Sequence, residues 1–590
     1  MTPINRPIPT VILQAGRQWW RFCEPVQIFT AKHVSEVQPA MEQIAKAVEE
    51  DSLYAAGYLS YEAAGAYGLP TRVPTAGGPP ILWFGLFNHR EEVPPPSGGG
   101  SYTFGEWRPS LDPETYFAAI SRIKEVIAAG YTYQANFTFH LRAGFAGDPW
   151  ALFSALYAAQ RSHYCAYFDL GRIVVCSASP ELFFSLDGDR LESRPMKGTA
   201  ARGLTLSADQ VQIDWLKESE KNRAENVMIV DMIRNDFGRI AATGSVRVPE
   251  LFTIERYPTL LQMTSTVTAR SEAPLPEILA AMFPCASITG APKMRTMAIL
   301  RDLEKEPRGL YTGAIGFIAP GHQAQFNVAI RTVVIDQDAG EATYGVGSGV
   351  VWDSDAATEY AECLLKARVL DVDSRPLQDL QLLETLRWTS EQGFFLLDLH
   401  LRRLSDSAEY FDFVFDEAEI RHLLEQLTDD LSSDSKVRLL LSRDGQIKLE
   451  TVPIDLKRQH KPLRVGLALQ PVSSTNVWLY HKTTRRDVYE QVRASRPECE
   501  EVILWNERGE LTEATTSNIV VELGGRLVTP PISSGLLAGT YRAHMLDKGD
   551  VIEQVIRVEE LSEATGLWLI NSVRGQRQAV LVISEPDDRR

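Results

Sequence analysis

Residues 345–363 have the sequence GVGSGVVWDSDAATEYAEC, in which three alternating glycines lead into an acidic loop and then a stretch with helical spacing. The glycine- and valine-rich part predicts a strand, and DAATEYAECLLKARVLDV (355–372) predicts the helix that follows it. The glycines precede WDSD instead of following a strand into GxGxxG, so they do not make a dinucleotide-binding fingerprint. They suit a nest of backbone amides for a carboxylate or phosphate, and equally a flexible hairpin.

Carboxylates recur on two predicted helices. Glu359 and Glu362 are three residues apart and share a helix face, and Glu225 lies in a second predicted helix over 207–240. Such oxygens suit a hard cation such as Mg²⁺. Acidic residues on helices are usually solvated, however, so these residues alone do not establish a metal site.

Composition bounds the class of protein. The chain has 590 residues, 44% hydrophobic and 23% charged, and is too long for a single core. A net charge of −17 argues against a nucleic-acid or anionic-membrane partner, because those surfaces select for lysine and arginine. The six cysteines lack CxxC pairs, which predicts neither disulfides nor zinc. Without a membrane-length apolar run or a signal-like N-terminus, a cytoplasmic enzyme is expected.

The pattern along the chain predicts two domains. A capped amphipathic helix is expected over 112–130, and strands are expected over 52–64, 81–87, 131–145, 309–320, 324–336 and 341–355. We expect a first domain over 1–370, a linker over 371–380 and a second domain over 381–590.

RPMKGTA (194–200) contains a lysine, Lys197, with no acidic residue in the same stretch. Taken alone, it is most simply a surface charge. Its setting changes that interpretation, because GDPW, SASPELFF, RPMKGTA, AENVMIVDMIRNDFGRI, SITGAPKMR, YTGAIGF, NVAIRT and GVGSGVVWDSDAATEYAEC follow one another in this order. Over roughly residues 50–370 the chain thereby resembles the chorismate-binding enzymes, and within them the aminodeoxychorismate synthases (component I). The resemblance implies an α+β fold, with an α/β sandwich of two large antiparallel sheets and a site in the cleft between them.

The resemblance also implies a pocket. Glu225 and Glu362 match carboxylates that hold Mg²⁺ against a substrate carboxylate, with Glu359 added as a metal candidate from the same helix face. Arg331 and the backbone of Gly347, Ser348 and Gly349 match groups that bind the other negative charges of chorismate. The further matching pocket positions are Thr289, Tyr311, Lys293, Gln134 and Asn136.

Lys197 is the residue that distinguishes the synthases, because anthranilate synthases carry a small residue at this position. The resemblance implies that its neutral amine attacks C2 of chorismate while the C4 hydroxyl leaves, after which ammonia adds at C4. Glu181 matches the general acid/base that protonates the hydroxyl. One departure is Gln262, which stands where many relatives have a histidine.

The source of ammonia is not expected in this chain. A glutamine amidotransferase needs a cysteine nucleophile on a glycine-rich elbow, and none of the six cysteines lies in such a sequence. We therefore expect ammonia from a separate glutamine amidotransferase subunit, or free ammonia.

Residues 381–590 contain LLETLRW, LYHKTTRRDVY, NERGELTEATTSNIVV, LLAGTYR and INSVRGQRQAV, an order that resembles the two-subdomain, fold-type IV pyridoxal phosphate enzymes. The closest resemblance is to 4-amino-4-deoxychorismate lyase, which implies release of pyruvate and formation of 4-aminobenzoate for folate synthesis. Lys482 matches the Schiff-base lysine, and Glu513 matches the partner of the pyridinium nitrogen. The implied phosphate-binding set is Arg403, the turn at Gly539, Thr540 and Tyr541, and Ser572.

This second half departs from the family at its start. Relatives have an extra strand pair and a DRGL…G segment ahead of ET, whereas this half opens almost directly at LLET, so we expect it to borrow packing from the first half. Two alternatives stay open for it: an aminotransferase acting on a small amino acid, and a non-catalytic docking module for the glutaminase subunit. A homodimer is expected by analogy only.

Overall fold

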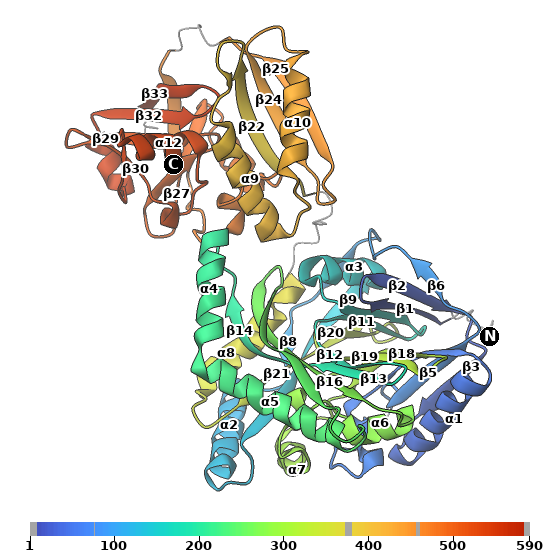
Figure 1. Ribbon diagram of the computed structural model, residues 1–590. Coiled ribbons are helices and arrows are strands. Elements are labelled where there is room, and N and C mark those ends of the chain that lie inside the picture. The colour runs from blue at the N-terminus through green and yellow to red at the C-terminus, as the bar shows by residue number, and fades with distance from the viewer. Residues whose placement is uncertain (1–8, 76, 372–379, 456–460, 583–590) are drawn as a thin grey trace. The chain divides into compact units, whose positions relative to one another are not determined.

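The computed structural model describes residues 9–75, 77–371, 380–455 and 461–582, so the predicted linker over 371–380 lies, apart from its two ends, outside the described residues. The chain divides into two compact units (Figure 1). The first is made of Met1–Ala201 and Gln212–Leu377, and the second of Arg202–Val211 and Gln378–Arg590. The second unit thus includes a short segment from early in the sequence.

Two large sheets form the first unit, and their strands pair antiparallel. The 11-stranded sheet has the order β17 (Gly290–Ala291), β9 (Gln134–Gly147), β21 (Glu341–Val350), β20 (Thr332–Asp336), β11 (Ile173–Ser179), β10 (Tyr164–Asp169), β1 (Thr10–Ala15), β2 (Gln18–Cys23) and β6 (Glu91–Val93), with β7 (Tyr102–Phe104) and β8 (Arg108–Pro109) paired to β9. The 10-stranded sheet has the order β14 (Met196–Ala201), β16 (Leu260–Arg270), β13 (Arg190–Arg194), β12 (Leu182–Asp187), β19 (Gln323–Val328), β18 (Ala314–Ala319), β4 (Tyr54–Leu59), β5 (Leu82–Phe87) and β3 (Gln27–Ala31), with β15 (Arg247–Arg256) paired to β16.

The two sheets pack face to face between helices. In β10, Ala166 and Phe168 enter the core between the sheets, while Cys165 and Tyr167 enter a second core on the opposite face. Successive strand residues point to opposite faces, so this alternation buries both sides of the sheet. The helices that pack on the 11-stranded sheet are α2 (Pro113–Ala128), α3 (Pro149–Gln160) and α8 (Ala356–Ala367); those that pack on the other sheet are α1 (Val37–Glu50), α5 (Glu220–Gly238) and α6 (Leu275–Met282), and α7 (Lys293–Leu303) contributes to both cores. The predicted α+β class with two large antiparallel sheets is confirmed.

Three local predictions are corrected. The helix expected over 207–240 is broken into α4 (Leu206–Glu218) and α5, because Ser219 is non-helical and its hydroxyl caps α5 by accepting the Asn222 amide. The strand expected over 52–64 ends at Leu59, and Tyr61–Tyr67 is a 3₁₀ helix. The strand expected over 324–336 is two strands, β19 and β20, separated by Arg331, whose φ of 50° is incompatible with a strand.

The second unit contains two further sheets. One is antiparallel, with the order β23 (Gly393–Phe394), β22 (Leu382–Thr389), β24 (Ser435–Leu441) and β25 (Ile447–Pro453). The 8-stranded sheet is mixed, with the order β28 (Leu511–Ala514), β27 (Glu501–Trp505), β26 (Leu463–Leu467), β33 (Gly575–Leu581), β32 (Gly566–Asn571), β29 (Asn518–Leu523), β30 (Arg526–Thr529) and β31 (Ile552–Glu553). The helices of this unit are α9 (Leu397–Phe411), α10 (Glu417–Thr428), α11 (Asp487–Ala494) and α12 (Thr540–Lys548). Among the helices that the structure describes, none is both long and apolar enough to cross a membrane.

A buried ion pair connects distant segments of the first unit. The guanidinium of Arg308 donates to Glu304 at 2.7 Å and to the carbonyls of Asn136 and Ile288 at 2.6 and 3.0 Å. Glu304 also accepts from the amide and hydroxyl of Thr138, at 3.1 and 2.9 Å. Because α7, β9 and the segment before β17 meet at this one cation, Arg308 fixes how these pieces pack.

We expect Arg308→Ala to lower the free energy of unfolding by about 3–5 kcal/mol, because it leaves the buried carboxylate of Glu304 without its partner. Arg172→Ala is the control, since Arg172 pairs with Asp336 at 2.6 Å at the surface, where solvent screens the interaction. Urea unfolding followed by tryptophan fluorescence measures both variants. Equal losses would contradict a special role for Arg308.

Candidate functional sites

Lys197 lies at a β-bulge in β14, an edge strand of the 10-stranded sheet. The pairing of β14 with β16 shifts register between Met196 and Thr199, and Gly198 has a φ of 100°. A bulge re-aims the neighbouring side chains, and this backbone conformation favours glycine. The glycine after Lys197 is therefore what permits the bulge that sets the direction of the lysine.

The Lys197 amine lies close to one carboxylate and within electrostatic range of two others. Its Nζ lies 3.9 Å from Oε2 of Glu225, and the two side chains are only 17% and 18% exposed. Burial lowers the pKa of Lys197; Glu225, Glu362 and Glu359 oppose this, and Lys366 adds to it. The structure thus brings Lys197 together with all three predicted metal-ligand candidates.

The alternating glycines of β21 form neither a nest nor a hairpin. Gly347 pairs with Thr138 and Gly349 with Asn136 in a regular ladder with β9. What they provide is space: a Cβ on Gly349 would overlap the Lys197 amine and come within 2.6 Å of Nε2 of Gln134.

Gly345 and Ser348, also in β21, each contact a tyrosine side chain. A Cβ on Gly345 would overlap the ring of Tyr311, so this glycine admits one of the predicted pocket residues. Ser348 has its hydroxyl 2.9 Å from that of Tyr116 in the buried core. Its side chain is therefore engaged within the core, and the prediction that residue 348 contacts a substrate rests on its backbone.

Glu181 provides a proton donor and acceptor in the same region. It is buried just before β12, and its Oε1 accepts a hydrogen bond from Ser287 at 2.6 Å. Burial raises the pKa of Glu181 to about 7, although Ser287 and Lys197 both lower it. A carboxyl with this pKa exchanges protons readily at neutral pH.

Glu225 and Glu362 fit an Mg²⁺ ion that takes only two ligands from the protein. Glu362 pairs with Lys366 at 2.7 Å; burial raises its pKa, but Lys366 and Lys197 lower it more, so Glu362 is ionised at neutral pH. Glu359 accepts from Ser354 at 2.7 Å. Within the described ranges, no group of three or more His, Cys, Asp and Glu side chains is arranged around a metal position. Mg²⁺ commonly binds one or two carboxylates and completes its coordination shell with water and substrate oxygens. Glu225 and Glu362 can supply these two carboxylates.

Three other predicted residues have side chains that are engaged by neighbouring protein groups. The guanidinium of Arg331 donates to Gln160 and lies 5.9 Å from the ring centroid of Tyr257. Lys293 pairs with Asp236 at 2.8 Å. The hydroxyl of Thr289 donates to backbone carbonyls within its own turn.

Sequence reasoning missed Lys366. Its Nζ donates to the Gly347 carbonyl at 2.9 Å, in addition to its pair with Glu362. In the sequence this is an ordinary (i, i+4) Glu–Lys pair on a helix, which carries no functional signal.

A cavity of about 540 Å³ in the second unit gathers all six predicted cofactor residues, a volume typical of small-molecule sites. They are Lys482, Glu513, Arg403, Thr540, Tyr541 and Ser572. Desolvation lowers the pKa of Lys482 to about 8, helped by Arg403 and opposed by Glu384. An amine with this pKa is partly neutral, and so nucleophilic, near physiological pH.

Glu513 is the one acidic side chain among the residues that line this cavity. Burial raises its pKa to about 7, against hydrogen bonds from the Tyr489 hydroxyl at 2.7 Å and the Leu537 amide at 3.1 Å. Such a carboxyl gains most from a cationic partner, and a protonated pyridine nitrogen is one. The residues present therefore fit pyridoxal phosphate.

Several hydrogen bonds hold the end of the cavity that contains Arg403. Arg403 donates to both oxygens of Glu384, at 2.8 and 2.7 Å, and to the Ala538 carbonyl at 3.0 Å. Glu384 also contacts His400 at 2.6 Å, whose other ring nitrogen lies 3.2 Å from the Thr540 hydroxyl. Thr540 begins α12, and a helix N-terminus attracts phosphate.

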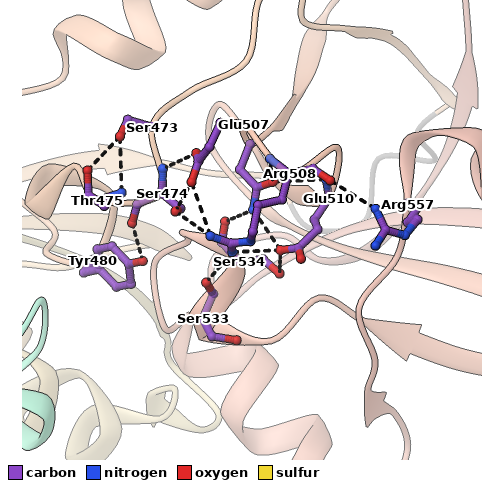
Figure 2. Close-up of polar contacts among 11 residues, drawn as sticks. Ser473, Ser474, Thr475, Tyr480, Glu507, Arg508, Glu510, Ser533, Ser534 and Arg557 are labelled. Carbon is purple, nitrogen blue, oxygen red and sulfur yellow. Dashed lines mark hydrogen bonds and ion pairs between the residues drawn. The ribbon is translucent and has the colours of Figure 1, made fainter.

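Away from the cavity lining, Arg508 joins three loops, as Figure 2 shows. Its guanidinium donates to the Ser474 hydroxyl at 2.7 Å, to Glu510 at 2.8 Å and to the Ser533 carbonyl at 2.9 Å. The chain runs from these loops into Lys482, Glu513 and Gly539, respectively. This network therefore sets the spacing of the segments that carry the cavity residues.

Five further cations line the cavity that sequence reasoning did not identify. They are Lys436 and Arg438 in β24, Arg486 just before α11, Arg574 in the turn before β33, and Arg577 in β33. The Nε of Arg577 is buried without a hydrogen-bond partner. The alternation Lys-Val-Arg, which puts residues 436 and 438 on one face of a strand, is the signal that identifies two of them. The lining suits a ligand with several negative charges.

Comparison with known proteins separates the same two parts. Residues 8–371 match the family model of the chorismate binding enzymes, and residues 381–582 match the model of the class IV amino-transferases. Aminodeoxychorismate synthase component 1 of Klebsiella aerogenes is 40% identical over 258 residues, which are 43% of this chain and 57% of that protein. A component 1 of anthranilate synthase from Haloarcula marismortui is 41% identical over 259 residues, 44% of this chain and 53% of that protein.

The chain spans about half the length of these relatives, and overall identity does not separate the two activities that they are named for. Anthranilate synthase component I of Streptococcus pneumoniae superposes with a TM-score of 0.52 at 21% identity, over 62% of this chain and 93% of that one. That likeness shows a shared fold.

We expect pyridoxal phosphate, trapped with borohydride, to label Lys482 in preference to exposed lysines. With a pKa of about 8, roughly half of Lys482 is neutral at pH 8, against about 0.4% of an ordinary lysine of pKa 10.4. Peptide mass spectrometry measures the site, and labelling rises as pH increases through 8. Lys46, 70% exposed, is the internal control, and equal labelling of the two lysines would contradict the assignment.

Proposed function

The chain belongs to the chorismate-binding enzymes, and we propose that its first unit aminates chorismate at C4 to give 4-amino-4-deoxychorismate. We propose further that the second unit eliminates pyruvate from this product, giving 4-aminobenzoate for folate synthesis. The observation that carries the first assignment is Lys197, whose partly desolvated amine lies among carboxylates beside Gly349.

In the proposed amination, Lys197 acts as a nucleophile. Its neutral amine adds to C2 of chorismate, the two ring double bonds shift, and the C4 hydroxyl leaves. Glu181 gives the proton that lets this hydroxyl depart as water, which its pKa of about 7 permits at neutral pH. Ammonia then adds at C4, the double bonds return, and Lys197 is released. Covalent attack at C2 directs nitrogen to C4, and so to the para product.

Substrate binding uses the charges around the lysine. Glu225 and Glu362 would hold Mg²⁺, with Glu359 as a neighbouring acceptor, and the metal supplies positive charge for a substrate carboxylate. Arg331 is proposed for the remaining anionic group. Nitrogen comes from a separate glutamine amidotransferase subunit, in keeping with the name "component 1" of the Klebsiella relative.

In the proposed elimination, the second unit's own residues move the proton and orient the substrate. Pyridoxal phosphate, when bound, supplies an electron sink. In this proposal Lys482 takes the proton from C4; Glu513 would pair with the cofactor's ring nitrogen, and Arg403, Thr540, Tyr541 and Ser572 would hold its phosphate. The enolpyruvyl group at C3 then departs as pyruvate, and the ring becomes aromatic.

The main alternative for this unit is amino transfer, which the match to the class IV amino-transferase model favours. The extra cations of the cavity support a substrate with two carboxylates, as aminodeoxychorismate has; they are Lys436, Arg438, Arg486, Arg574 and Arg577. A small monocarboxylic amino acid would bring a single carboxylate to these five cations.

Product analysis tests the proposal. We expect the pure chain with chorismate, ammonium, Mg²⁺ and pyridoxal phosphate to yield 4-aminobenzoate and pyruvate in equal amounts, measured by mass spectrometry and a coupled pyruvate assay. Lys197→Ala should form neither product, whereas Lys482→Ala should accumulate aminodeoxychorismate. Anthranilate as the product would refute the amination, and amino transfer to a 2-oxo acid without pyruvate would establish the alternative.

A glycine variant tests the geometry around Lys197 without touching its chemistry. We expect Gly349→Ala to reduce amination by roughly 100-fold, since a 1 Å displacement of a reacting group has an effect of that order. Gly238→Ala is the matched control, because it adds the same methyl group in open space at the end of α5. Steady-state chorismate consumption measures both, and similar rates for the two variants would argue against contact between Gly349 and the nucleophile.

A further inference from the structure

Residues 202–211 belong to the second unit, although they follow directly on β14, which carries Lys197. Arg202 is 8% exposed and pairs with the fully buried Asp209 at 2.7 Å. Its guanidinium lies 4.2 Å from the ring centroid of Tyr410 and donates to the Tyr410 carbonyl at 3.0 Å. The Tyr410 hydroxyl donates in return to the Gly203 carbonyl at 2.7 Å. The segment is thereby fastened to the last turn of α9.

Tyr410 in turn packs against His481, the residue before Lys482. Its ring centroid is 4.4 Å from that of His481, which also lies 4.7 Å from Phe411. The Nδ1 of His481 is 2.9 Å from the Ser407 hydroxyl. Burial lowers the pKa of His481 to about 4, and Arg202 lowers it further, so the ring is neutral at pH 7. His481 is therefore a neutral, buried packing residue.

A second contact leads toward Glu513. Leu204 packs into a hydrophobic cluster that contains Leu479, Tyr480 and Tyr489. Tyr489 donates its hydroxyl to Glu513 at 2.7 Å. The segment thus reaches Lys482 through Tyr410 and His481, and it reaches Glu513 through the cluster that contains Tyr489.

We propose that Arg202, Gly203 and Leu204 are positioning residues for Lys482 and Glu513, so that the second site is complete only when this segment is present. The proposal rests on the cofactor role assigned to this cavity. On the C-terminal side of His481, the backbone is held by β22: the Leu383 amide donates to the Lys482 carbonyl at 2.9 Å, and Leu382 pairs with Thr483. His481 itself is held by packing against Tyr410, which Arg202 and Gly203 hold in turn.

The test uses the full chain with substitutions at two points of this contact path. Arg202→Ala should weaken pyridoxal phosphate binding by roughly 5- to 150-fold, the usual range for groups that act on a site through others. It should also shift the pH at which Lys482 becomes trappable by borohydride. Tyr410→Phe, which keeps the ring against His481 and loses the bond to Gly203, should change both readouts in the same direction and less. Arg202→Lys should restore part of the affinity.

Arg443→Ala is the matched control. Arg443 also stacks on an aromatic ring, Phe413 at 4.6 Å, and donates to a backbone carbonyl just after α9, that of Asp412 at 2.9 Å. Its loss should leave cofactor affinity and Lys482 titration unchanged. Wild-type values for both Arg202→Ala and Tyr410→Phe, or equal effects of Arg202→Ala and Arg443→Ala, would overturn the proposal.

Cofactor binding and lysine titration do not depend on which product forms. A wild-type chain that binds pyridoxal phosphate at Lys482 but releases no pyruvate would refute the proposed elimination and still test the positioning residues. A wild-type chain that does not bind it at Lys482 would overturn both.

Discussion

Burial of a primary amine is the constraint on which both sites depend. Desolvation lowers the pKa of Lys197 and of Lys482, and a carboxylate held too close would cancel this effect by stabilising the ammonium form. Glu225 is 3.9 Å from Lys197, longer than the 2.7–2.9 Å or so of a charge-assisted hydrogen bond. In the second unit, Glu513 accepts from Tyr489 and Leu537 instead of from the lysine. Each lysine therefore has an acidic residue nearby that attracts it but does not form a short hydrogen bond with it.

The backbone meets this constraint in two different ways. In the first unit, Lys197 belongs to one sheet and Gly349 to the other, so the amine lies where the two sheets meet. The bulge at Gly198 turns the side chain toward that junction, and the missing side chain of Gly349 leaves room for it. In the second unit, loops carry the cavity residues, and a polar network through Arg508 fixes their spacing, so that burial there depends on side chains more than on strand geometry.

Sequence patterns predicted the fold class because alternating strands are recognisable from the order of residues along the chain. The six residues that motifs singled out in the second half line one cavity, and their roles there stay predictions. The break at Ser219 was missed because apolar spacing continues across it and only the cap interrupts the helix. The glycines of β21 were misinterpreted for a similar reason: their function is to admit Lys197 and Tyr311, which come from distant strands and loops. Lys366, Arg574 and Arg577 look like ordinary surface charges until the chain has folded.

The placement of residues 202–211 follows from the same physics and could not be inferred from sequence order. Arg202 carries a charge, and its burial requires an anionic partner and an aromatic face; Asp209 supplies the first and Tyr410 the second. A chain that began at residue 381 would leave the Tyr410 hydroxyl without its acceptor and the cluster around Leu479 without Leu204. The second unit, whose main part starts close to LLET, is thus completed by a segment that lies in sequence inside the first unit. Because this segment continues from the strand of Lys197, one stretch of sequence supplies both the strand that carries Lys197 and the packing next to His481 and Lys482.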